Sequence, residues 1–78
     1  MGESREVLEL AWMRNLCHGG MVREIRLAAG LSLAEVARDV GVCASAVHSW
    51  ETSRTIPRGK AAAKYAKLLR ELESLARR

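Results

Sequence analysis

Several features are scarce or missing in this 78-residue chain, which has one proline, no phenylalanine and only two cysteines. Scarce proline together with abundant alanine, leucine, arginine and glutamate favours helices over strands and predicts an all-α fold. Two scattered cysteines exclude a disulfide framework and indicate a reducing compartment. No apolar run approaches the ~18 residues of a membrane span, and no basic-then-apolar leader is present. We therefore expect a cytoplasmic protein, neither membrane-spanning nor secreted.

The chain also lacks the residue patterns of catalytic and cofactor sites. Gly19 and Gly20 suggest only a hinge or a helix start, not a glycine-rich loop that binds phosphate. No nucleophile has a partner base at a useful spacing. The Cys and His side chains at positions 17, 18, 43 and 48 would supply four metal ligands, but their spacing fits no zinc pattern. We therefore predict no enzyme, no metal site, no cofactor and no small-molecule ligand.

Positive charge is concentrated in the last third of the chain. Residues 1–53 contain five arginines and seven acidic residues, whereas residues 54–78 contain eight basic and two acidic residues. This asymmetry suits attraction to a polyanion from one side, although a solvated helix face has the same composition. A single domain of this size also has a small core, so burial against a second copy would stabilise it.

Residues 32–51 contain the clearest pattern, which predicts two short helices joined by a tight turn. Ser32 and Glu35 have the spacing of a capping box that opens the first helix. Gly41 is placed to end that helix in a left-handed conformation. The second helix would run from Ala44 to about Thr52. Apolar residues recur at helical spacing on one face of each helix: Val36, Ala37 and Val40 in the first, Val47 and Trp50 in the second.

These residues carry a family resemblance. The segment SLAEVARDVGVCASAVHSWE is similar to the helix-turn-helix of the Cro and phage-repressor (XRE) family of DNA-binding proteins. The similarity continues through TSRTIP to Pro57 and extends back through REIRLAAGL to Arg23. An αα-hairpin in some other helical bundle explains the apolar spacing but not the order of small, turn and apolar residues. The resemblance implies a compact bundle of about five helices with a lambda-repressor-like helix-turn-helix.

In this family the outer side of the second helix enters the DNA major groove. The residues on that side are expected to read bases: Ala44, Ser45, His48, Ser49 and Thr52. None of them is Arg, Lys, Gln or Asn, the side chains that make bidentate contacts to guanine or adenine. We therefore expect modest direct readout, with DNA shape and site spacing supplying part of the specificity.

A second set of residues is expected to contact DNA phosphates. Backbone amides at the helix start, at Ser32 and Leu33, can bind a phosphate, although the family usually has Gln in place of Leu33. The basic residues after the reading helix would meet the backbone beside the groove: Arg54, Arg58, Lys60 and Lys64. Each neutralised phosphate releases counterions, so binding should fall steeply with salt.

The resemblance also implies a structural pair and reveals one departure. Arg26 is expected to pair with Glu51 at the end of the reading helix, since a carboxylate at a helix C-terminus favours a nearby cation. Two solvated side chains are the alternative. Ser53 stands where a Gly usually ends the reading helix, and a left-handed Ser costs on the order of 1 kcal/mol.

Three further helices are predicted. A helix over residues 4–17 is apolar on more than one face, so it should pack on the core or on another subunit. A helix from Met21 to Ala29 should end at Gly30 and turn Val22, Ile25 and Ala29 inward. A helix over residues 59–77 should cover the core with four residues: Ala62, Tyr65, Ala66 and Leu69.

Two apolar surfaces are candidates for dimer formation. Leu68, Leu72 and Leu75 fall four and three residues apart and form a short coiled-coil-like seam, which is the favoured contact between copies. An intramolecular apolar stripe is the alternative reading of these leucines. The N-terminal helix around Trp12 and Leu16 is the competing surface for a dimer.

These patterns predict a sequence-specific double-stranded DNA-binding regulator, formed by residues 1–78 as one domain with a helix-turn-helix core at 21–58. It would bind an inverted-repeat operator as a homodimer in the bacterial cytosol or nucleoid, or in the host cytosol if phage-encoded. Its appearance is most similar to a Cro-type phage regulator. The alternatives are an antitoxin or chromosomal XRE autorepressor, and a protein-interaction module that no longer binds DNA.

Overall fold

The computed structural model describes the backbone of residues 2–76 and the side chains of residues 7–76. These residues form five helices and no strand, which confirms the all-α prediction. The helices are α1 (Gly2–His18), α2 (Met21–Ala28), α3 (Leu33–Val40), α4 (Ala44–Glu51) and α5 (Gly59–Ala76). α1 starts two residues before the predicted boundary and ends one residue after it, which is within the usual variation of helix ends. The predicted end of the last helix, residue 77, lies outside the described residues.

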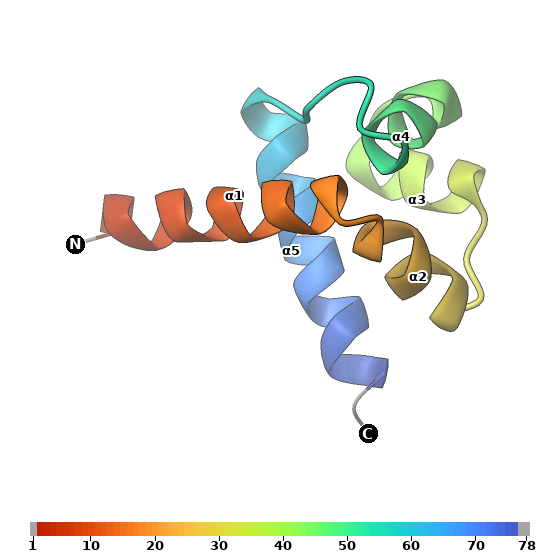
Figure 1. Ribbon diagram of the computed structural model, residues 1–78, viewed down its shortest axis with the longest axis horizontal. Coiled ribbons are helices and arrows are strands. Elements are labelled where there is room, and N and C mark those ends of the chain that lie inside the picture. Colours follow the sequence, from red (N-terminus) through yellow and green to blue (C-terminus); the bar gives the residue numbers. More distant parts are fainter. Residues whose placement is uncertain (1, 77–78) are drawn as a thin grey trace.

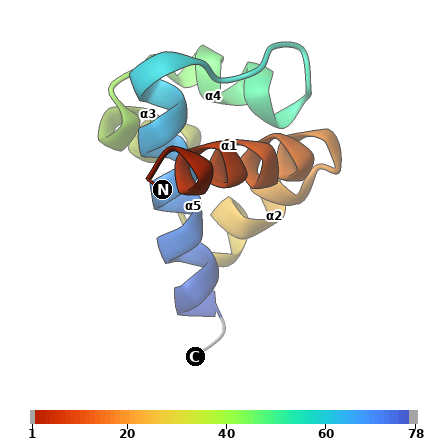
Figure 2. The ribbon, with the colours of Figure 1, turned by 90° about the vertical axis from the view of Figure 1, so that its left-hand side faces the viewer.

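The two long helices cross at the centre of the molecule. α1 runs across α5, while α2, α3 and α4 lie together on one side of this crossing (Figure 1). The N-terminal half of α1 and the last turn of α5 point away from the other helices in different directions. Turned by 90°, the molecule shows α4 and the loop that follows it above α1, at the level where α5 begins (Figure 2).

The core forms where all five helices meet, around Tyr65 of α5. The Tyr65 ring lies 4.7 Å from the ring of Trp50, with 45° between the ring planes. Met13 and Cys17 bring α1 into the same cluster and are both buried. The other buried apolar members come from α2 to α5: Val22, Ile25, Val36, Ala37, Val40, Val47, Ala62, Ala66, Leu69 and Leu72. α1 is therefore an integral part of the core at its C-terminal half.

Two predicted orientations are wrong. Leu72 was expected in a seam between copies, but it is only 7% exposed and belongs to the core. It lies seven residues after Tyr65 and three after Leu69, so it continues the face that covers the core. Ala29 was expected to point inward but is exposed, because α2 ends one residue earlier and Ala29 is its C-cap.

A surface contact joins the two long helices outside the core. The Arg70 side chain of α5 donates from Nε to Glu9 Oε2 of α1 at 2.7 Å. The same guanidinium lies 4.1 Å above the ring of Trp12, which is half-buried. A cation over an indole face is attracted by the ring quadrupole, so this contact holds α1 across α5. None of the helices in the described part of the chain is long and apolar enough to cross a membrane.

Candidate nucleic-acid interface

The start of α3 is fixed by its own side chains. Ser32 Oγ accepts from the Glu35 backbone N–H at 3.0 Å, and the Ser32 backbone N–H donates to Glu35 Oε1 at 2.8 Å. These hydrogen bonds hold the pKa of Glu35 below its ordinary value. The predicted capping box is therefore present. It also occupies the Ser32 amide, so a phosphate at this helix start would bind to the later amides, including that of Leu33.

A tight turn then sets the direction of α4. Gly41 has a φ of 89°, a conformation that disfavours any side chain. The backbone N–H groups of Gly41 and Val42 both donate to the carbonyl of Ala37, at 2.8 and 3.0 Å. These bonds satisfy the end of α3 and reverse the chain within three residues, so that α4 packs directly on α3.

The inner side of α4 is packed against the core. Val47 is fully buried and Trp50 is 6% exposed against Tyr65. A β-branched side chain and a large ring on one face leave this helix little freedom to rotate. The opposite side of α4 is consequently presented outward in one orientation.

A buried ion pair holds the end of α4. Arg26 of α2 donates from Nε to Glu51 Oε2 at 2.6 Å and from Nη2 to Glu51 Oε1 at 3.0 Å. Its third nitrogen, Nη1, donates to the Leu31 carbonyl at 2.9 Å. Both side chains are almost fully buried, and the hydrogen bonds that Arg26 donates to Glu51 raise the pKa of Arg26. A bidentate, desolvated pair of this kind fixes α4 against α2 and against the chain entering α3.

The residue after α4's C-cap, Ser53, connects this part of the molecule to α1. It is the only non-glycine residue with positive φ among those described, at 62°. Its Oγ donates to the carbonyl of Cys17 at 2.9 Å. Glycine would adopt this positive φ without strain, but it has no hydroxyl. The serine hydroxyl compensates for the backbone strain by binding a carbonyl at the end of α1. The sequence contains no local signal for this bond, since the partners lie 36 residues apart.

The outer side of α4 carries small polar side chains. Ser45 and His48 are exposed, while Ala44 and Ser49 are half-buried. Thr52 is exposed, but its hydroxyl donates to the carbonyls of His48 and Ser49 at 3.0 and 3.3 Å. Its proton is therefore used within its own helix, and this position offers a base only an acceptor oxygen and a methyl group.

The N-cap position of α4 holds an exposed thiol. Cys43 makes no side-chain cap hydrogen bond to the helix amides. Its Sγ lies 3.1 Å from Ser45 Oγ, and this hydrogen bond lowers the pKa of the Cys43 thiol. Cys17, by contrast, is buried beneath Ser53, and burial raises the pKa of its thiol to about 11.

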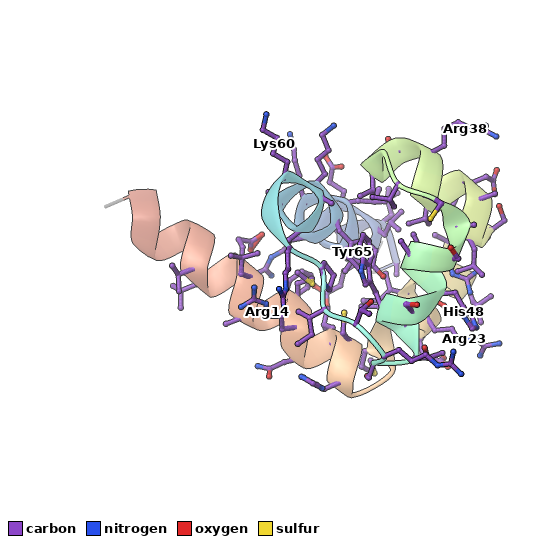
Figure 3. All side chains as sticks on the ribbon, turned by 90° about the horizontal axis from the view of Figure 1, so that it is seen from above. Arg14, Arg23, Arg38, His48, Lys60 and Tyr65 are labelled. Atoms are coloured by element: carbon purple, nitrogen blue, oxygen red, sulfur yellow. The ribbon has the colours of Figure 1, made fainter. Side chains whose placement is uncertain are left out.

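The basic side chains expected at the DNA backbone come from the loop after α4 and from the start of α5. All four predicted phosphate-contacting cations are exposed: Arg54, Arg58, Lys60 and Lys64. Seen from above, Lys60 lies at the start of α5, at the edge of the molecule away from His48 of α4 (Figure 3). Pro57 in that loop is fully buried, which anchors the segment between Arg54 and Arg58.

Further exposed cations have no assigned place in the sequence-based site, among them Arg14 of α1, Arg23 of α2 and Arg38 of α3. In the view from above, Arg23 lies at the same edge of the molecule as His48 (Figure 3). Their charges are visible in the sequence, but which side of each helix faces outward depends on tertiary packing. No group of three or more His, Cys, Asp or Glu side chains in the described residues is placed to hold a metal ion.

Comparison with known proteins bears on this arrangement. A family model described as helix-turn-helix, of the XRE and lambda-repressor type, matches residues 22–74. The match covers α2, α3, α4 and all but the last residues of α5, and it leaves α1 outside. No curated protein and no solved structure matches the chain.

Proposed function

Since the chain belongs to the helix-turn-helix family of the XRE and lambda-repressor type, a family of DNA-binding regulators, we propose that it is a Cro-type repressor that occupies an inverted-repeat operator as a homodimer. The observation that supports this proposal is the asymmetry of α4. Its inner side is buried with Val47 and Trp50, and its outer side presents Ser45 and His48 to solvent. A helix held in this way can enter a major groove without any rearrangement of the fold.

The proposed mechanism needs occupancy of a promoter and no catalytic group. Ser45, His48 and Ser49 each offer single hydrogen bonds to base edges, and Ala44 offers contact to a thymine methyl. Phosphate contacts from Arg54, which lies three residues after the end of α4, would supply sequence-independent affinity. Because single hydrogen bonds discriminate less than bidentate ones, the spacing of two half-sites and the shape of the DNA carry the rest of the specificity.

A second copy would bind on the C-terminal half of α5. Leu75 is 59% exposed there, and Leu68 is half-buried. Two apolar hollows share Leu72 and Leu75 as lining residues, and one of them extends to Ala28, Ala29 and Leu31 at the end of α2. Since Leu72 is in the core, the proposed contact consists of Leu68, Leu75 and this hollow. The competing surface is the N-terminal half of α1, where Val7 and Leu8 are 62% and 68% exposed.

Footprinting on the DNA upstream of the protein's own coding sequence tests the proposal. Two-fold symmetry predicts two protected half-sites whose centres are about 34 Å apart on one face of the duplex. Protection of a single half-site at all concentrations would contradict the homodimer.

A second experiment tests which residues contact bases and which contact phosphates. Ser45→Ala combined with Ser49→Ala should reduce the preference for the operator over mutated operators by about tenfold, because two hydrogen bonds to bases are lost. Arg54→Ala should weaken binding to every sequence alike and reduce the log–log salt slope by about 0.9. Lys67→Ala on α5 is the control for Arg54→Ala, since it removes one positive charge from an exposed position elsewhere. If Arg54→Ala changes sequence choice and the serine pair does not, the reading face is assigned wrongly.

Measuring binding at a series of salt concentrations also distinguishes the proposed DNA-binding protein from the alternative, a protein-interaction module. DNA binding should weaken with a steep negative dependence on salt, whereas association through apolar helices should change little. An antitoxin or a chromosomal autorepressor would give the same DNA-binding results. The genes beside the coding sequence distinguish those two from a phage regulator.

A further inference from the structure

α1 ends directly beside the loop that follows the reading helix. Ser53 Oγ donates to the Cys17 carbonyl at 2.9 Å, and the Gly20 backbone N–H donates to the same carbonyl at 3.3 Å. One carbonyl thus joins the last turn of α1, the turn into α2 and the loop after α4. Arg54, an expected phosphate contact, is the residue after Ser53. The hydrogen bond from Ser53 therefore holds the end of α1 close to this expected contact.

The exposed side of α1 at this junction is basic and polar. Arg14 and His18 are one helical turn apart and exposed, on the side of α1 next to the buried Met13 and Cys17. Among the described residues, the Arg14 guanidinium has no ion-pair or hydrogen-bond partner, unlike Arg26 and Arg70. Viewed from above, Arg14 projects from α1 near the loop between α4 and α5, at the edge of the view away from Lys60 (Figure 3).

We infer that α1, which lies outside the family domain, adds a DNA phosphate contact of its own through Arg14, with His18 beside it as a further donor. The inference rests on the proposed DNA-binding function and extends the contacted backbone past Arg54. It fits the composition of α4, because a reading helix without bidentate side chains leaves more of the affinity to backbone contacts. A phosphate oxygen accepts two parallel N–H bonds from one guanidinium, which suits a single exposed arginine.

The test uses the full chain and a short duplex of mixed sequence, since a phosphate contact is independent of base sequence. Arg14→Ala should weaken binding about 5–10-fold near 0.1 M salt and make the log–log salt slope about 0.9 shallower. Arg14→Lys keeps the charge and should keep the slope. Lys67→Ala removes one exposed positive charge from α5, where Lys67 lines the same hollow as Glu71 and Asp39 of α3, and should leave both affinity and slope unchanged.

Thermal melts of each variant without DNA separate a binding effect from a folding effect. Arg14→Ala should have the same melting temperature as the wild type. Wild-type binding with an unchanged slope in Arg14→Ala would overturn this inference and leave the proposed function intact. Failure of the wild type to bind any duplex would overturn both. A loss in Arg14→Ala that Lys67→Ala reproduces would also overturn the inference, because it would reflect net charge alone.

Discussion

α3 and α4 have the same length, eight residues each, but they are held in place by different parts of the chain. α3 begins at the Ser32 and Glu35 capping box and ends at left-handed Gly41, so both of its ends are determined by neighbouring residues. α4 begins at Cys43 without a side-chain cap bond. It is held by a core that includes α5 and by an ion pair to α2.

This difference shows which properties of the motif are local and which are tertiary. The limits of α3 follow from hydrogen bonds within ten residues. The orientation of α4 depends on Tyr65 and Arg26, which lie 15 and 25 residues from their partners on α4. Changes far from the outer side of α4 should therefore alter DNA binding through its position, whereas changes at the ends of α3 should act mainly on local stability.

The largest expected effect comes from breaking the tertiary support of α4. Arg26→Ala leaves the Glu51 carboxylate buried without its partner, which should lower the free energy of unfolding by about 3–5 kcal/mol or prevent folding. Urea denaturation followed by circular dichroism measures the loss. Arg70→Ala is the control, because its exposed pair with Glu9 and its contact with the Trp12 ring should together contribute only about 1–2 kcal/mol. Similar losses in the two variants would show that α4 is not held by the buried pair.

A smaller effect is expected at Ser53, where α4 is joined to α1. Ser53→Ala keeps the strained φ of 62° but loses the bond to the Cys17 carbonyl, so unfolding should become easier by about 1 kcal/mol. Ser53→Gly loses the same bond and also removes the strain, so its stability should stay near the wild type. Denaturation of the two variants side by side measures the difference. A glycine variant as weak as the alanine variant would mean that strain at this residue is unimportant.

The smallest effect is expected at the local support of α3. Hydrogen bonds from Ser32 hold the pKa of Glu35 below its ordinary value of 4.5. A carboxyl with a lowered folded pKa stabilises the fold above its unfolded pKa, and this contribution is lost as the pH falls through the folded value. Glu35→Gln should therefore make stability less dependent on pH below about 4.5. Denaturation at a series of acidic pH values measures this, with Glu24→Gln as the matched control. If the stability of the wild type and of Glu35→Gln depends on pH in the same way, the Glu35 carboxylate does not contribute to the acid sensitivity of the fold.

The same division explains how much was predictable from the sequence. The capping box, Gly41 and the inward positions Val47 and Trp50 follow from spacing over a few residues, and all are found as predicted. Leu72 fits two overlapping helical patterns, one with Leu69 and one with Leu68 and Leu75. Helical spacing alone cannot choose between a core face and a surface seam, because only the packed neighbours decide.

The candidate site was predictable to a similar extent. The exposure of Ser45 and His48 follows from the burial of the other side of their helix. The use of the Thr52 hydroxyl within α4 does not, because a threonine near a helix end can bond either to its own backbone or to a ligand. The contact between Ser53 and Cys17 needs the crossing of α1 with the loop after α4, and no pattern within either segment encodes it.

The two tryptophans are intrinsic fluorophores in two different parts of the molecule. Trp12 lies in α1, outside the family domain, and Trp50 lies in α4, inside it. Trp50 is buried in α4, 4.7 Å from Tyr65, whereas Trp12 lies on α1 with the Arg70 guanidinium 4.1 Å from its ring centre. A variant that retains only one indole would report on one helix alone. Emission from Trp12 would then follow the detachment of α1 from α5, and emission from Trp50 would follow the melting of the helix-turn-helix itself.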